Sequence, residues 1–160
     1  MIRARARWVI YVTLFLGLMF VLIPLPLEWR VIRPDATALI LFYWVIALPH
    51  RVGVFTAFCV GFLQDVINGS PLGLSSPGLM LATLFLLLNY ERVRQYDGVL
   101  QCLVIFMMLS ISVGIEQWLR SGTAVPLVPS GAILGLLLSV LCWLPTRTAL
   151  RRLRRYYEVF

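Results

Sequence analysis

Six apolar runs follow one another along the chain, and short polar or turn-forming segments separate them. An α-helix needs about 20 consecutive apolar residues to cross a hydrocarbon core of about 30 Å. Four of the runs have about that length, and the other two are shorter. The pattern predicts six transmembrane helices, at residues 8–27, 36–48, 52–67, 73–90, 99–119 and 124–144.

The composition supports this interpretation. Of the 160 residues, 61% are hydrophobic and 13% are charged, whereas soluble domains contain about 45–50% apolar and about 25% charged residues. A soluble globule of this size would lack a polar surface, which excludes a soluble enzyme, a secreted domain and a disordered tail. We expect an all-α integral membrane protein with one polytopic domain over residues 1–160 and a basic tail at residues 146–160.

The ends of the runs allow more than one arrangement. Asp35 suits the N-cap of the run 36–48, and Pro49 ends that run. Because the runs 36–48 and 52–67 are short, they form either two crossings of a locally thin bilayer or a hairpin buried among other helices. The first run is too long for the core of a signal peptide, and no small-residue cleavage site follows it, so we expect it to stay attached.

Breaks between the later runs are rich in turn formers. Between residues 68 and 78, nine of eleven residues are Asn, Gly, Ser or Pro. Such a segment cannot be exposed to lipid, so we expect a surface loop or the lining of a protected cavity. A polar link at 91–98 and a tight turn at 120–123 are expected to separate the last three helices.

The arginines predict the orientation. The formal net charge is +7, and every basic residue is Arg. With six helices and a cytoplasmic N-terminus, eleven arginines lie inside and three outside, as the positive-inside rule requires, and both termini are cytoplasmic. Since the arginines border the hydrophobic runs, we expect them to meet anionic lipid and not nucleic acid. The inside set is Arg3, Arg5, Arg7, Arg51, Arg92, Arg94, Arg147, Arg151, Arg152, Arg154 and Arg155, and the outside set is Arg30, Arg33 and Arg120.

A row of mostly small residues extends along the third apolar run. Gly53, Ala57, Gly61, Asp65 and Gly69 recur at every fourth position. Small residues at this spacing let two helix backbones approach closely. We expect this face to pack on another helix, either in the same chain or in a partner.

Asp65 lies on that row near the turn-rich segment. A carboxylate at membrane depth is costly, so it is normally paired, protonated or exposed to water. One interpretation is a proton or ion site or an anchor for a partner's positive group. The other is a capping and hydrogen-bonding role beside the loop, with Arg33 or Arg120 as neighbours.

Two further polar residues have simple structural interpretations beside functional ones. Glu116 precedes Arg120 by one helical turn, which suits an ion pair at a helix end. His50 lies in a cytoplasmic turn, where an interfacial polar residue and a pH-sensitive ligand are the alternatives.

The basic tail alternates arginine with apolar side chains. As a helix it would bind the membrane surface with one edge. A stop-transfer flank that only fixes topology and a docking site for a cytoplasmic protein are the alternatives. The arginines are Arg151, Arg152, Arg154 and Arg155, and the apolar residues are Leu150, Leu153, Tyr156, Tyr157 and Phe160.

Motifs for catalysis and for metal or phosphate binding are missing from the sequence. Cys59, Cys102 and Cys142 are isolated within apolar runs, and the chain has one His, so we interpret the cysteines as small buried apolar residues. We expect no catalytic residue, no metal and no cofactor.

Three segments carry a family pattern. Residues 33–35 read Arg-Pro-Asp, residues 43–53 contain Tyr-Trp and Pro-His-Arg, and residues 61–73 place Asp65 between two glycines. In this order and spacing they resemble the rod shape-determining protein MreD family, although Gln64 stands where many members are more apolar. The motif positions outside the small-residue row are Arg33, Pro34, Asp35, Tyr43, Trp44, Pro49, His50 and Arg51.

The resemblance implies a multi-pass protein of the bacterial inner membrane that belongs to the elongation machinery. Family members are held to act with the bitopic protein MreC and, through it, with MreB filaments, a SEDS glycosyltransferase and a class B penicillin-binding transpeptidase. The family is also similar to the six-helix substrate-binding subunits of energy-coupling-factor transporters. The MreD family pattern contains no catalytic residue.

Two functions follow from the sequence and the resemblance. The first is a non-catalytic scaffold that binds an MreC-like helix and helps couple filaments to side-wall peptidoglycan synthesis and cell shape. The second is a transporter-like membrane subunit that binds a small molecule or a lipid intermediate in a central cavity, with Asp65 beside a loop that covers it.

Overall fold

The computed structural model describes residues 8–23, 26, 33–122 and 132–157, and all regular structure in this part of the chain is helical. The all-α class expected from the sequence is therefore confirmed for these residues. The helices are α1 (Trp8–Leu22), α3 (Ala36–Ala47), α4 (Val54–Asn68), α5 (Ser76–Gln95), α6 (Gly98–Ser121) and α7 (Ala132–Tyr156).

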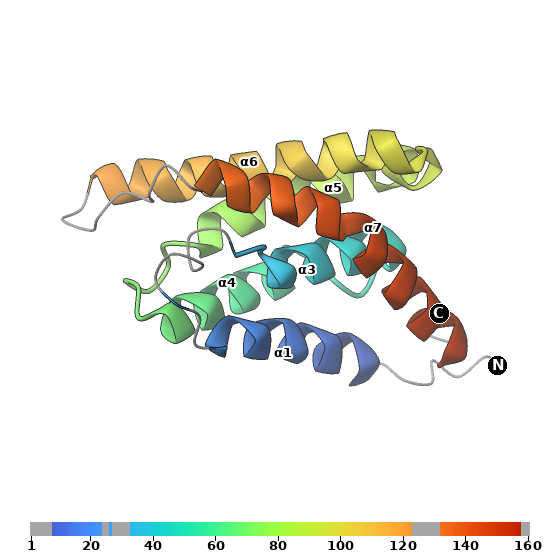
Figure 1. The fold of residues 1–160 in the computed structure, drawn as a ribbon, viewed down its shortest axis with the longest axis horizontal. Coiled ribbons are helices and arrows are strands. Elements are labelled where there is room, and N and C mark those ends of the chain that lie inside the picture. Colours follow the sequence, from blue (N-terminus) through green and yellow to red (C-terminus); the bar gives the residue numbers. More distant parts are fainter. Residues whose placement is uncertain (1–7, 24–25, 27–32, 123–131, 158–160) are drawn as a thin grey trace.

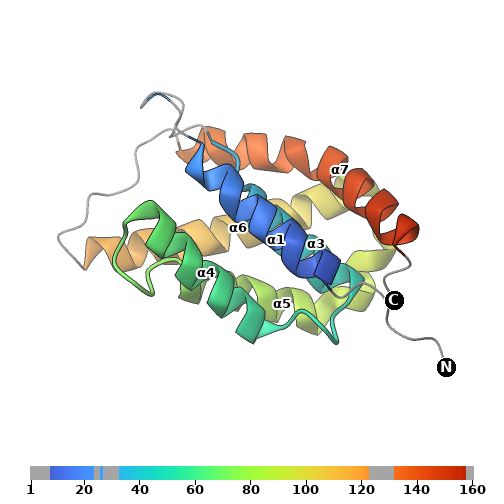
Figure 2. The same cartoon turned by 90° about the horizontal axis from the view of Figure 1, so that it is seen from below.

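Helix α3 forms the centre of the bundle. It lies between α1 and a layer made by α5, α6 and α7 (Figure 1), and it contacts each of these four helices. In the view from below, α1 crosses in front of α3, with α4 and α5 on one side and α7 on the other (Figure 2). Almost every residue of α3 is buried, so this short helix is covered by protein along its length.

Successive helices run in opposite directions, so the bundle has two distinct ends. The start of α1 and the end of α7 lie together at one end, which we call the termini end (Figure 1). There the Trp8 and Tyr157 rings meet edge to face, with centroids 5.5 Å apart. The opposite end, the loop end, contains the 69–75 segment. The first and the last described helix therefore meet at the same end of the bundle.

The arginines divide unequally between these ends. At the termini end lie Arg51, Arg92, Arg94, Arg147, Arg151, Arg152, Arg154 and Arg155, and at the loop end lie Arg33 and Arg120. Arg3, Arg5, Arg7 and Arg30 lie outside the described residues. The part of the chain that the structure describes therefore has the charge asymmetry expected of a membrane protein.

Large apolar side chains cover the outside of the bundle. Helices α6 and α7 are long and apolar enough to cross a membrane, and only 22% of the most apolar stretch of each is buried. Most of each stretch therefore faces outward from the bundle. The exposed set includes Tyr11, Phe15, Phe20, Phe55, Phe58, Phe62, Leu81, Phe85, Leu88, Leu103, Met107, Trp118, Leu137 and Leu141.

Several helix boundaries differ from the expected ones. Helix α1 ends at Leu22 and not at residue 27, and helix α5 begins at Ser76 and not at residue 73. Helix α5 continues to Gln95, so residues 91–95 of the expected polar link are helical. Helix α6 includes Arg120 and Ser121, which were expected in a tight turn. Helix α7 is described from Ala132 and passes through Pro145 to Tyr156, so the basic tail continues the last helix. Residues 123–131 and Phe160 lie outside the described residues.

Candidate functional site

Asp65 organises the turn-rich loop. Its side chain is 0% exposed. The Gly73 N–H donates to its Oδ2 at 2.9 Å, and the Ser75 N–H donates to Oδ1 at 3.0 Å and to Oδ2 at 3.2 Å. Hydrogen bonds from backbone N–H groups compensate the burial of a carboxylate. This geometry favours the capping role over the ion site.

The loop also depends on backbone conformations that suit glycine. Gly69 ends α4 at φ 64°, and Gly73 has φ 86°. Side chains other than glycine rarely adopt these values. The Ser70 N–H then donates to the Asp65 carbonyl oxygen at 3.0 Å. Both the main chain and the side chain of Asp65 therefore hold the 69–75 segment.

The small-residue row packs inside the chain. A Cβ on Gly61 would lie 2.7 Å from the Cα of Ser76, at the start of α5. Ala57 is fully buried, whereas a Cβ on Gly53 or Gly69 would meet nothing within 4 Å. The middle of the row is thus an α4–α5 contact.

A second close contact was missed from the sequence. A Cβ on Gly78 would lie 2.5 Å from the carbonyl oxygen of Ser112, so α5 and α6 touch through their backbones. Gly78 was counted among the turn formers of a loop. In the structure the first turn of α5 contains Ser76, Pro77 and Gly78. Pro77 lies in the first turn, where proline is tolerated.

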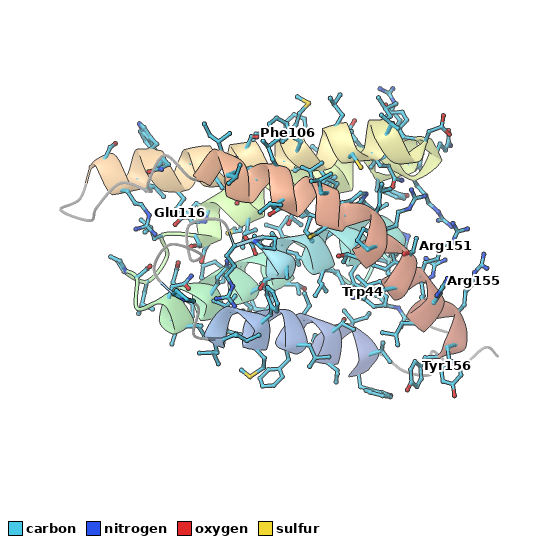
Figure 3. The ribbon with its side chains drawn as sticks, viewed as in Figure 1. Trp44, Phe106, Glu116, Arg151, Arg155 and Tyr156 are labelled. Atoms are coloured by element: carbon cyan, nitrogen blue, oxygen red, sulfur yellow. The ribbon has the colours of Figure 1, made fainter. Side chains whose placement is uncertain are left out.

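The aromatic motif pair lies in the core. Trp44 is 0% exposed, and its Nε1–H donates to Thr13 Oγ1 at 2.8 Å, which joins α3 to α1. Figure 3 shows Trp44 inside the bundle. Thr13 in turn donates to the carbonyl oxygens of Val9 and Ile10. Tyr43 is buried beside Trp44, with ring centroids 5.4 Å apart.

The Arg-Pro-Asp motif begins α3. The Ala38 N–H donates to Asp35 Oδ1 at 3.0 Å, so Asp35 is the predicted N-cap. Gln64 donates to Asp35 Oδ2 at 3.3 Å, and the Asp35 N–H donates to Ser139 on α7 at 3.0 Å. Burial raises the pKa of the Asp35 carboxyl, and the hydrogen bonds from Ala38 and Gln64 oppose that rise. The motif therefore connects α3 with α4 and α7.

Arg33 joins this motif to the first helix. It donates to the carbonyl oxygen of Val21 at 2.7 Å, and its guanidinium lies 4.9 Å from the centre of the Phe20 ring. A guanidinium over an aromatic face is a favourable contact. Pro34 follows and lines the cavity described next.

A cavity of about 400 Å³ lies at the loop end, and both polar and apolar residues line it. It is lined by Asp35, Gln64 and Ser139 and by the Glu116–Arg120 pair, whose atoms approach to 2.6 Å. This confirms the i, i+4 ion pair expected from the sequence. Asp65 itself does not line the cavity, but Ser75, whose N–H donates to the Asp65 carboxylate, does. Among these lining residues, Ser139 is the one that the sequence did not single out.

The Pro-His-Arg motif makes the turn between α3 and α4. The Arg51 and Val52 N–H groups donate to the Leu48 carbonyl oxygen at 3.0 and 3.2 Å. Pro49 follows the end of α3, because the residue before a proline disfavours helix. His50 is exposed.

The tail arginines lie along the last turns of α7. Arg151, Arg152 and Arg155 are exposed and Arg154 is half-buried. Figure 3 shows Arg151, Arg155 and Tyr156 towards the end of this helix, far from Glu116 on α6. Within the described ranges, no group of three or more His, Cys, Asp or Glu side chains is placed to hold a metal ion.

Comparison with known proteins agrees with the sequence pattern. The family model described as rod shape-determining protein MreD matches residues 2–153. A curated protein of Haemophilus influenzae, named rod shape-determining protein MreD, is 28% identical over 138 residues, which cover 84% of this chain and 83% of that protein. No solved structure matches.

Proposed function

This chain belongs to the rod shape-determining protein MreD family, and we propose that it is a non-catalytic membrane scaffold of the bacterial elongation complex. In this proposal all six helices are embedded in the inner membrane with both termini in the cytoplasm. The scaffold binds an MreC-like bitopic protein. It thereby helps couple MreB filaments to the SEDS glycosyltransferase and the class B transpeptidase.

The observation that carries the proposal is the set of hydrogen bonds that the motif residues make within the chain. Arg33, Asp35, Trp44 and Asp65 direct their hydrogen bonds to other parts of the same chain. They fix helix ends, join helices and hold a loop. Residues used in this way build a rigid shape, and a rigid shape with an apolar exterior suits the binding of a partner's transmembrane helix.

The small-residue row is a weak candidate for the docking face, because Gly61 already packs on α5. A partner helix needs a surface that the chain leaves open. The outward faces of α1, α4, α5, α6 and α7 are such surfaces. The basic residues of the termini end are then available to the lipid surface or to a cytoplasmic partner.

Cross-linking tests this proposal. Single cysteines are introduced into a variant whose three native cysteines are replaced by serine, and the MreC-like protein carries a cysteine in its membrane helix. We expect disulfide formation at outward positions of at least one helix and none at the buried neighbours. The pairs, outward residue first, are Phe15 and Leu14, Phe58 and Ala57, Phe85 and Leu86, Met107 and Met108, and Leu144 and Trp143.

Each buried neighbour is a control for reactivity and expression, because it lies one residue from its outward partner. Cross-links confined to one helix would identify the docking face. The proposal would be refuted if none of the outward cysteines reacted with the bitopic protein in cells that keep their rod shape.

The cavity at the loop end favours a second candidate function, the binding of a small molecule or a lipid intermediate. Its volume of about 400 Å³ lies within the range of about 300–1,000 Å³ that is usual for ligand sites. Within the described residues, Gln64 Oε1 is buried without a hydrogen-bond partner, so it could accept a bond from a ligand. A fold like that of the transporter subunits would also provide such a cavity, and this likeness stays a prediction.

A further inference from the structure

Four arginines from two helices surround a small pocket at the termini end. The pocket has a volume of about 150 Å³. Arg94 of α5 lines it from one side, and Arg147, Arg151 and Arg154 of α7 line it from another. Because residues three and four positions apart share one face of a helix, these three arginines form a continuous row along α7.

None of the described residues that line the pocket is acidic, so none of them balances these charges. Its other lining residues are neutral and include Tyr43, Gln101 and Trp143. The one salt bridge recorded among the described residues, Glu116–Arg120, lies at the opposite end of the bundle. Like charges gathered around one cavity repel each other, so a bound anion would stabilise this arrangement.

A neutral hydrogen-bond donor also lines the pocket. Trp143 is 1% exposed, and its Nε1–H is buried without a partner in the described part of the chain. A buried donor without an acceptor is unfavourable, so a ligand that accepts this hydrogen bond would be stabilised here. Tyr43 lines the same pocket, so its hydroxyl provides a second polar group there.

Aromatic side chains mark the depth of this end of the bundle. Trp8 and Tyr156 are 55% and 81% exposed, and Trp8 packs against Tyr157. Exposed Trp and Tyr rings are enriched at the level of the lipid headgroups. In a bilayer that places these rings at its interface, the pocket would lie at the level of the lipid phosphate groups.

We propose that this pocket binds a phosphate group, supplied by the headgroup of an anionic phospholipid or by free phosphate. Arginine forks match phosphate oxygens in geometry and charge. The pocket is about half the size of the smallest usual ligand sites, so it accommodates one such group and not a nucleotide. This inference is independent of the proposed partner binding, since it concerns the chain alone.

Two pairs of substitutions on one helix test the proposal. R151Q/R154Q removes two lining arginines, and R152Q/R155Q removes two arginines that do not line the pocket. Both remove the same charge, so long-range attraction falls equally.

The purified full-length chain in uncharged detergent is titrated with dioctanoyl phosphatidylglycerol, with dioctanoylglycerol, and with inorganic phosphate against chloride at constant ionic strength. Native mass spectrometry and the shift in unfolding temperature report binding.

We expect phosphatidylglycerol to bind wild type and R152Q/R155Q equally, and R151Q/R154Q at least about tenfold more weakly, since hydrogen bonds to charged groups are lost. R94Q/R147Q, which takes one arginine from each helix, should give the same loss. If inorganic phosphate shows these relative affinities and phosphatidylglycerol does not, the phosphate group that the pocket binds is free phosphate. The proposal would be overturned if R151Q/R154Q and R152Q/R155Q weakened binding equally, or if dioctanoylglycerol bound as tightly as phosphatidylglycerol. It would also be overturned if neither phosphatidylglycerol nor inorganic phosphate bound to wild type.

Discussion

Asp65→Ala is expected to lower the free energy of unfolding by about 3 kcal/mol or more. The substitution leaves the N–H groups of Gly73 and Ser75 without their acceptor, and each such loss costs about 1–3 kcal/mol. Asp65→Asn keeps one acceptor oxygen for Ser75 but turns an NH₂ group towards Gly73, so an intermediate loss is expected. Thermal and denaturant unfolding of the chain in detergent measures both changes.

Asp97→Ala is the matched control. Asp97 is an exposed residue at the start of α6, and its side chain makes no capping hydrogen bond, so stability should change little. The structural role of Asp65 also predicts that rod shape in cells follows the amount of folded protein. Wild-type stability in Asp65→Ala would contradict the interpretation, as would a fully folded Asp65→Asn protein that loses all shape control.

Gly78→Ala is expected to destabilise the chain by about 1–3 kcal/mol, even though alanine favours helix. The added Cβ would lie 2.5 Å from the Ser112 carbonyl oxygen and 3.0 Å from the Ser112 Cα. Both atoms belong to the backbone of α6, so the two helices must move apart. Unfolding in detergent and the yield of folded protein in membranes measure the effect.

Gly114→Ala is the control on the neighbouring helix, because a Cβ there meets nothing within 4 Å. Alanine is about 1 kcal/mol more favourable than glycine in a helix interior, so this variant should be unchanged or more stable. Equal stability of the two variants would show that α5 and α6 are not in backbone contact.

The sequence predicted well those features that depend on local patterns. Runs of apolar residues located the six described helices, Asp35 was identified as an N-cap, and the spacing of Glu116 and Arg120 predicted their ion pair. Each of these depends on residues within one or two helical turns. The number of membrane crossings and the orientation stay predictions.

Features that depend on distant parts of the chain could not be predicted. The partners of Asp65 are backbone N–H groups, which no residue type identifies. A glycine beside Ser and Pro, such as Gly78, is typical both of a loop and of a close helix contact. Only the position of Gly78 against Ser112 in the structure distinguishes these two cases. The tail arginines gave no sign that Arg94, on another helix, lies at the same pocket.

The small-residue row shows the same limit of prediction from the sequence. The sequence predicted a close helix contact but could not say whether the other helix belongs to this chain. Gly61 against Ser76 is an internal contact, so Gly61→Leu would disturb the bundle itself and is a poor probe of partner binding. Outward positions are the better probes.

The most direct test of the scaffold is native mass spectrometry of the chain purified from membranes of cells that it keeps rod-shaped. We predict a mass that corresponds to the chain together with the MreC-like bitopic protein. A chain that carries a small molecule and no protein partner would contradict the scaffold and favour the cavity as the functional site.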